Sequence, residues 1–201
     1  GAETDECQSV KQTTDGGYII AGTTNSFVAG DKDYYLIKTN ENGDTIWSKT
    51  FDNSKYDNAF STLQTTDGGF VIVGYTQQTG NSSYDVYLIK TDANGIEQWN
   101  QTFGGPDADG GYSVQQTTDG GYIIAGYAES FGNGDDEDVY LIKTDGDGNV
   151  TSEFTIPINT NRKLQKTVDI LGRETKGTKN QPLFYIYDDG TVEKRIVKKP
   201  E

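Results

Sequence analysis

The side chains that could carry chemistry in this chain are almost all carboxylates. Its 201 residues include 31 Asp and Glu, a single cysteine (Cys7) and no histidine. Without histidine, a Ser-His-Asp triad and an imidazole metal site are excluded, and a lone cysteine forms no internal disulfide. Two carboxylates about 5–9.5 Å apart can hydrolyse a glycosidic bond, and converging carboxylates can hold calcium. Hydrolysis and calcium binding are therefore the two site chemistries to consider.

Two acidic runs have the composition of calcium loops, Asp145-Gly-Asp147-Gly-Asn149 and Gly134-Asp-Asp-Glu-Asp138. Neither run is followed by the distal bidentate Glu that completes a calcium loop. Asp, Gly and Asn are also the residues that tight turns require, and chance pairs of carboxylates are common in so acidic a chain. We therefore expect turns and solvated charge here, with no catalytic residue, no metal ligand and no cofactor.

The overall charge limits the partners. The formal net charge is −14, whereas a nucleic-acid-binding surface needs a basic stripe. No apolar stretch approaches the ~18 residues of a membrane span. The chain opens with the polar sequence GAETDECQ, so we expect any signal peptide to have been removed or to lie outside this sequence. We expect neither nucleic-acid binding nor a transmembrane segment.

An internal repeat organises most of the chain. The sequence QTTDGG(Y/F)(I/V)I(A/V)G starts at Gln12, Gln64 and Gln116, at offsets of 52 residues. The sequence YLIKT starts at Tyr35, Tyr87 and Tyr140, at offsets of 52 and 53. The chain has 25 threonines and only seven leucines, which favours strands over helices. Three copies in register indicate a β-repeat protein.

Each copy contains four strand-like segments separated by tight-turn residues. Four antiparallel strands in a period of about 50 residues are typical of a β-propeller blade of kelch-like length. We predict blades over residues 5–56, 57–108 and 109–154. Closed propellers usually have about 4–8 blades, so three arrangements remain open. The repeats form the last part of a longer propeller, which we favour, or dimerise into a six-bladed ring, or fold as a β-trefoil.

The turn before the last strand of each copy carries a further signal. In TNENGDTIW and TDANGIEQW, a glycine stands four residues before Trp47 and Trp99. This turn resembles the tryptophan-docking turn of quinoprotein-type propellers, in which an indole of the outer strand packs between neighbouring blades. We expect the same architectural role for Trp47 and Trp99. In the third copy Ser152 stands at the tryptophan position.

Composition changes near residue 155, which indicates a second unit over residues 155–201. Residues 1–154 hold 7 Lys and Arg against 25 Asp and Glu, a net charge of −18. Residues 155–201 hold 10 Lys and Arg against 6 Asp and Glu, a net charge of +4. Short strand-like runs such as TVDI, LFYIY and VEKRIV favour a small β-sandwich-like unit.

This tail resembles the C-terminal sorting domain of type IX secretion cargo in Bacteroidota. The matching motifs are KTVDILGRE (Lys166 to Glu174) and FYIYDDGTVEKRIVKK (Phe184 to Lys199). The motif positions are occupied by Asp169, Gly172, Arg173, Gly190 and Lys198. The resemblance implies recognition by an outer-membrane translocon and a secreted or surface-bound protein. A small β-unit that caps the blades is the alternative.

The loops suggest where a ligand binds. The first-to-second and third-to-fourth connections of each copy are nearly constant, whereas the second-to-third and blade-to-blade connections diverge and share the opposite end of the blades. Binding residues of propellers lie on such variable loops. The aromatic residues in these connections are our candidate ligand contacts: Phe27, Tyr56, Tyr84 and Phe131. Sequence drift with local packing is the alternative.

The sequence thus predicts an all-β, non-enzymatic binding module for a glycan or a protein, exported through its tail. A structural spacer without a ligand is the second interpretation, and a carboxylate-based hydrolase is the third.

Overall fold

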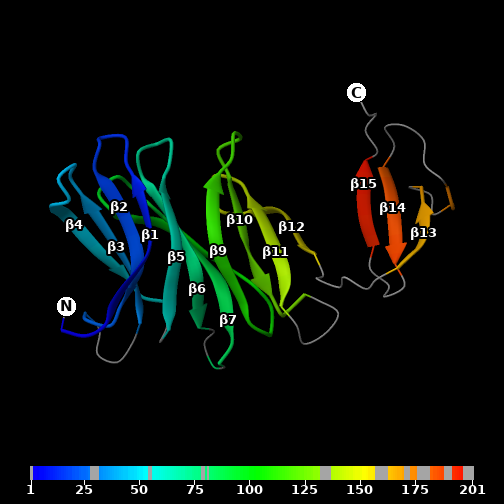
Figure 1. Ribbon diagram of the computed structural model, residues 1–201, viewed down its shortest axis with the longest axis horizontal. Helices are drawn as coiled ribbons and strands as arrows, with labels where there is room; N and C mark the ends of the chain where they lie inside the picture. Colours follow the sequence, from blue (N-terminus) through cyan, green and yellow to red (C-terminus); the bar gives the residue numbers. More distant parts are fainter. Residues whose placement is uncertain are drawn as a thin grey trace. The chain divides into compact units, whose positions relative to one another are not determined.

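The computed structural model describes residues 2–27, 32–53, 56–77, 80, 82–131, 137–156, 163–169, 173–175, 182–187 and 192–196. It divides into two compact units, Gly1–Pro157 and Ile158–Glu201. All regular structure in the described ranges is β-strand (Figure 1). The described part of the chain accordingly has no helix of the length and apolar character that a membrane span requires. The predicted all-β class is confirmed.

The first unit consists of three sheets, each with four antiparallel strands in sequence order. Blade 1 holds β1 (Asp5–Gln12), β2 (Tyr18–Thr24), β3 (Asp33–Thr39) and β4 (Thr45–Phe51). Blade 2 holds β5 (Asp57–Gln64), β6 (Phe70–Gln77), β7 (Tyr84–Thr91) and β8 (Glu97–Phe103). Blade 3 holds β9 (Asp109–Gln116), β10 (Tyr122–Ala128), β11 (Asp138–Thr144) and β12 (Val150–Ile156).

Each repeat therefore forms one propeller-type blade, and the three blades stand side by side in a row (Figure 1). Each of the strands β1 to β12 belongs to the sheet of its own repeat. A β-trefoil, in which strands of all three repeats share one barrel, is excluded by this pairing. The third copy forms its fourth strand although Ser152 replaces the tryptophan.

The Asp-Gly-Gly turns close the first hairpin of every blade in the same way. In blade 2 the Asp67 carboxylate accepts hydrogen bonds from Thr65 Oγ1 at 2.5 Å and from the Gly69 amide at 3.0 Å. Gly68 has a φ of 85°, a left-handed conformation that glycine adopts without a steric penalty. The fixed spacing of Thr, Asp and Gly in all three copies follows from this turn.

A lysine links each of these turns to the end of the third strand; it is buried in blades 1 and 2 and half-buried in blade 3. Lys90 Nζ lies 2.9 Å from Asp67 Oδ2 and donates to the Thr91 carbonyl at 2.8 Å. Lys38–Asp15 and Lys143–Asp119 repeat the ion pair, also at 2.9 Å. The Lys90 side chain is only 4% exposed, whereas that of Asp67 is 57% exposed. The lysine of each YLIKT segment is thus a structural staple of its blade.

Apolar side chains on both faces of the central strands hold the blades together. Between blades 1 and 2 the buried cluster is Ile19, Ala21, Tyr34, Leu36, Phe51, Ala59, Phe70, Ile72, Tyr87 and Ile89. Between blades 2 and 3 it is Val71, Val73, Val86, Leu88, Phe103, Val114, Tyr122, Ile124, Ala128, Tyr140 and Ile142. Successive residues of β6 enter different clusters because a strand alternates its faces. This explains why the strands read as continuous apolar runs.

The tryptophans pack between blades as expected. A Cβ placed on Gly95 would lie 2.8 Å from Trp47 Cζ3, and one placed on Gly148 would lie 2.8 Å from Trp99 Cζ3. Trp47 also packs edge-to-face with the Phe70 ring, at a centroid distance of 5.7 Å. Each indole therefore lies on a glycine turn of the next blade, where a side chain would leave no room for it.

The described strands of the second unit form one antiparallel sheet in the order β13, β14, β15. These strands are β13 (Leu164–Val168), β14 (Pro182–Tyr187) and β15 (Val192–Ile196). Val168, at the end of β13, also forms a bridge with Glu174.

The staple makes a first prediction. Asp67→Asn keeps a side-chain oxygen for the turn but removes the charge opposite Lys90, so a buried ammonium loses its counter-ion. We expect the free energy of unfolding to fall by about 1–2 kcal/mol, less than the roughly 3–5 kcal/mol for breaking a fully buried pair, because solvent screens Asp67. Urea unfolding measures it. Glu41→Gln on an exposed turn is the control, and an equal effect of both changes would contradict the staple.

The staple also predicts how stability depends on pH. Partial burial alone would raise the pKa of Asp67, but hydrogen bonds from Thr65, Lys90 and the Gly69 amide outweigh it and lower the pKa from 3.8 to about 2. Because the folded-state pKa lies below the unfolded one, this stabilisation is complete above the unfolded pKa and is lost as the pH falls towards 2. The stability difference between wild type and Asp67→Asn should therefore shrink between about pH 5 and pH 2. Urea unfolding at a series of pH values tests this, and a constant difference would contradict it.

Candidate functional site

The two ends of the blades differ in what they carry. The turns β1–β2 and β3–β4 and their equivalents lie at one end of the blades, which we call the turn end and which is uppermost in Figure 1. The β2–β3 and blade-to-blade connections lie at the other end, which we call the connection end. The divergent sequences thus gather at the connection end. Two side-chain clusters are found there, one aromatic and one acidic.

Bulges in the first strand of each blade position the aromatic cluster. The pairing of β5 with β6 skips Phe60, and the pairing of β9 with β10 skips Tyr112. In β1 the skipped residue is Gln8. A bulge redirects the side chain of the extra residue. Because blades 2 and 3 carry the same bulge, the rings of Phe60 and Tyr112 meet at a centroid distance of 5.2 Å.

Three more rings extend this contact into a continuous series. Tyr75 lies 5.6 Å from Phe60 and 4.8 Å from Tyr84, and Tyr127 lies 5.4 Å from Tyr112. We call these five residues, which come from five strands of blades 2 and 3, the aromatic strip. Tyr112, next to the central Phe60, is 50% exposed, and the other four are half-buried. Blade 1 does not continue the strip, because Gln8 and Thr23 replace the aromatic residues there.

Hydrogen-bonding groups border the aromatic strip. Asn58 Nδ2 donates to the Tyr75 hydroxyl at 3.3 Å. Burial raises the pKa of Tyr112, and the negative charge of Glu137 raises it further. Burial likewise raises the pKa of Tyr127, with smaller contributions from Tyr112 and Glu137. Both phenols therefore stay protonated near neutral pH and can donate hydrogen bonds to a ligand.

The structure disperses the four aromatic residues that the loops suggested. Tyr84 belongs to the aromatic strip. Phe27 and Phe131, 58% and 38% exposed, lie at equivalent places in blades 1 and 3 and contact Tyr35 and Tyr140 at centroid distances of 5.4 and 5.5 Å. Tyr56 is 44% exposed and forms a parallel bridge with Lys32 between blades 1 and 2. These three rings are not brought together in one site.

The sequence did not predict four members of the strip, Phe60, Tyr75, Tyr112 and Tyr127, because the prediction considered only aromatic residues of the connections between strands. The signal was present in the alignment of the repeats. Phe60 matches Tyr112 and Tyr75 matches Tyr127, whereas the first copy has polar residues at both positions.

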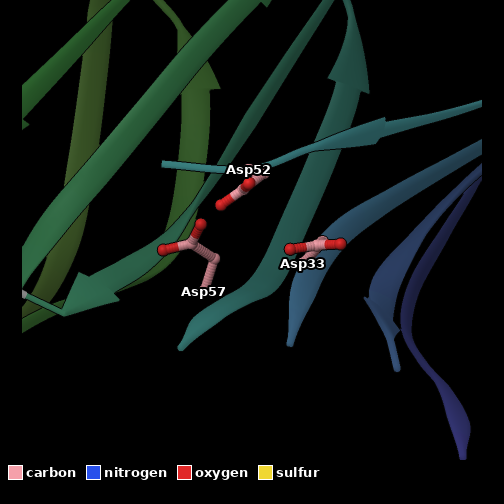
Figure 2. Close-up of side chains that lie close together, drawn as sticks. All are labelled: Asp33, Asp52 and Asp57. Carbon is pink, nitrogen blue, oxygen red and sulfur yellow. The ribbon is translucent and has the colours of Figure 1, made fainter. Parts of the chain in front are cut away.

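Three carboxylates form the acidic cluster at the junction of blades 1 and 2 (Figure 2). Asp33 begins β3, Asp52 follows β4 and Asp57 begins β5, and one oxygen of each lies within 4.8 Å of the others. Asp33 and Asp57 are fully buried, and Asp52 is exposed. Such oxygens suit a hard cation, although Ca²⁺ takes about 6–8 ligands. The sequence predicted no metal ligand here, because the three residues belong to separate segments of two blades and meet only in the fold.

The same positions have a structural use at the next junction. Asp109 accepts hydrogen bonds from the Gly105 amide at 2.8 Å and from Ser130 Oγ at 2.7 Å, while burial raises its pKa. Asp57 similarly accepts from the Asn53 amide at 2.6 Å. The third carboxylate is missing because Gly104 takes the place of Asp52. The aspartate that begins β5 or β9 therefore fixes the link from the preceding blade.

A cleft of about 440 Å³ lies at the opposite end, between the turns of blades 2 and 3. Lys90 and Gln116 are among its polar lining residues. Lys90 donates hydrogen bonds to Asp67 and Gln98, and Gln116 accepts a hydrogen bond from the Thr66 amide at 2.9 Å. Lys90 is thus used within blade 2, and Gln116 joins blades 2 and 3, so the cleft is a weaker candidate for a ligand site than the aromatic strip. The Asp145 run beside it is a turn, in which Asp145 Oδ1 accepts from the Asp147 and Asn149 amides.

Two residues of the sorting motif interact directly in the second unit. Arg173 Nη2 lies 2.7 Å from Asp169 Oδ2, and the Arg173 amide donates to Asp169 Oδ1 at 3.0 Å. The pair closes the loop that follows β13. Gly172, Gly190 and Lys198 lie outside the described residues.

No protein-family model and no curated protein matches the chain. Solved structures similar to it include an acylaminoacyl peptidase from Pyrococcus horikoshii, with 12% identity and a TM-score of 0.45 over 98% of this chain. Another is the β-propeller domain of the Trilobed protease from Pyrococcus furiosus, with an open velcro topology, 12% identity and a TM-score of 0.46 over 99% of this chain. The chain spans 33% and 59% of these two proteins. The assignment of blades rests on the strand pairing described above.

Proposed function

We propose that this chain is a non-enzymatic binding module of a secreted or cell-surface protein, and that the aromatic strip at the connection end binds a glycan. The observation that carries the proposal is the strip itself. It is a series of five rings in which Tyr112, next to the central Phe60, is half-exposed, and it is built by bulges that only blades 2 and 3 use for aromatic residues.

The chemistry of the strip suits a sugar chain. An aromatic ring offers an apolar face, and a tyrosine adds a polar tip, which matches the apolar faces and hydroxyl rims of sugar rings. The phenols of Tyr112 and Tyr127 and the Glu137 carboxylate supply donors and an acceptor beside those faces. Because the rings follow one another across two blades, the strip favours a ligand longer than one sugar unit.

A basic protein segment is the second candidate ligand, supported by one feature of the same site. Glu137 carries a negative charge beside Tyr112 and Tyr127, and a cationic side chain is attracted to an aromatic face as well as to a carboxylate. The net charge of −18 over residues 1–154 would attract such a partner.

The tail supports export as the second part of the proposal. The two motifs resemble those of type IX cargo, and the ion pair of Asp169 and Arg173 gives two of the motif residues a shared structural role. We infer that the translocon recognises this unit and that the chain acts outside the cell or on the outer-membrane surface.

Binding to a glycan array and to a basic peptide tests the site. We expect Tyr112→Ala to weaken glycan binding by at least roughly tenfold, about 1.4 kcal/mol, because it removes the most exposed ring of the strip. Phe27→Ala is the matched control, since it removes an exposed ring of the connection end outside the strip, and we expect it to change binding less than about twofold. Urea unfolding of both variants shows that the fold is retained.

Three results would contradict the glycan site. Equal losses in the two variants would place binding outside the strip. Binding of the basic peptide alone would favour the second candidate ligand. If the chain bound neither the glycans nor the basic peptide, the interpretation as a structural spacer would be favoured.

Secretion from a bacterium with a type IX system tests the tail, with an export signal fused ahead of the chain. We expect the full chain in the medium or on the cell surface, and a chain ending at Pro157 inside the cell. Arg173→Ala should reduce secretion, because it breaks the ion pair, whereas Lys163→Ala outside the motif should not. Immunoblots of the fractions measure this, and secretion of the truncated chain would overturn the proposal.

A further inference from the structure

The face of blade 1 that points away from blade 2 has the residues of a blade interface. We call it the leading face; its central positions are Tyr18, Ile20, Tyr35 and Ile37. The equivalent residues of blade 2 pack on blade 1 and are at most 2% exposed: Phe70, Ile72, Tyr87 and Ile89. On blade 1 all four positions are only half-buried. Val10 of the same blade is 56% exposed, whereas its equivalents Thr62 and Val114 are 0% and 3% exposed.

The leading face also has a glycine turn of the kind that an indole covers at the other two positions, and here the turn is uncovered. Gly95 and Gly148 are covered by Trp47 and Trp99 of the preceding blade. Gly43 has the same left-handed backbone, with a φ of 89°, but a Cβ placed on it meets no described atom within 4 Å. Tyr18 occupies the position of Phe70 and Tyr122, the rings with which the two indoles pack edge-to-face.

A second copy of this chain would not place an indole on Gly43. In a head-to-tail pair, blade 3 of one copy would stand before blade 1 of the next. Its outermost strand has Ser152 at the tryptophan position, so Gly43 would stay uncovered. The serine at this position therefore selects against simple self-association through the leading face.

We propose that the leading face of blade 1 is a docking surface for a further four-stranded blade that carries tryptophan on its outermost strand, as blades 1 and 2 do. Its indole covers Gly43 beside Tyr18, and its apolar face covers Ile20, Tyr35 and Ile37. The Gln12 side-chain amide donates a hydrogen bond to a carbonyl of its own turn, as that of Gln64 does. The Gln12 Oε1 atom would accept a hydrogen bond from a backbone amide of the docked blade, as Gln64 Oε1 accepts one from the Thr14 amide at 2.8 Å.

Cys7 is a natural reporter for this docking. The thiol is exposed, and the residue lies on β1 at the position of Ala59 and Gly111. Ala59 is 0% exposed, and a Cβ placed on Gly111 would lie 2.7 Å from Val73 Cγ2 of the preceding blade. A blade docked on the leading face would therefore cover the thiol.

The experiment joins a copy of residues 53–104 directly ahead of Gly1, which preserves the 52-residue spacing of the repeats. We expect labelling of Cys7 by a thiol reagent to slow at least roughly tenfold, since the thiol then reacts only on local opening. The matched control is the same extension with Trp99→Ser in the added copy, which reproduces the natural Ser152. We expect it to lose most of the protection.

Several outcomes would overturn the inference. One is that Cys7 of the extended chain is labelled as fast as Cys7 of the original chain. This result counts against docking whether the added blade is folded or unfolded, because docking is what would order that blade. Another is equal protection by the tryptophan and serine extensions, which would remove the role of Gly43. A third is a parent chain whose Cys7 becomes protected as the protein dimerises in light scattering, which would make a second copy the occupant. Glycan binding by the aromatic strip is independent of all three.

Discussion

The structure depends on one constraint, which is that each blade is apolar on both faces. Val71 and Ile72 are neighbours on β6, yet each is at most 1% exposed, because one packs on blade 3 and the other on blade 1. A four-stranded sheet with two such faces is not stable alone and gains stability only by stacking on its neighbours. The row of blades, the tryptophans between them and the half-buried faces at its two ends all follow from this constraint.

The same constraint restricts where function can be placed. Side chains on the sheet faces are used for stacking, and the turn end is occupied by the lysine staples and by the glutamines that join neighbouring blades. The connection end is the part whose sequence varies without disturbing either set of contacts. A bulge there turns the side chains of Phe60 and Tyr112 out of the regular alternation of the strands, so aromatic residues form a strip without entering the blade cores.

The sequence predicts those features that repeat. The 52-residue period, the glycine turns and the tryptophan spacing led to the four-stranded blades and to the packing of Trp47 and Trp99 between blades, because each depends on local residue types at a fixed offset. The aromatic strip and the acidic cluster depend on register and on which strands meet across a blade junction, and a single sequence contains neither. The lysine of YLIKT shows this limit, since its partner Asp67 is 23 residues away in another turn. The sorting-tail interpretation and the roles of Phe27, Tyr56 and Phe131 stay predictions.

Hydrogen–deuterium exchange followed by mass spectrometry tests the stacking constraint most directly. If two-faced blades are stabilised by their neighbours, the amides of β6 and β7 in blade 2 exchange more slowly than those of β2 and β3 in blade 1 and of β10 and β11 in blade 3. The equivalent strands have nearly the same sequence and the same hydrogen-bond ladder, so the difference isolates the effect of a second neighbour. Equal protection in all three blades, or the fastest exchange in blade 2, would contradict the account.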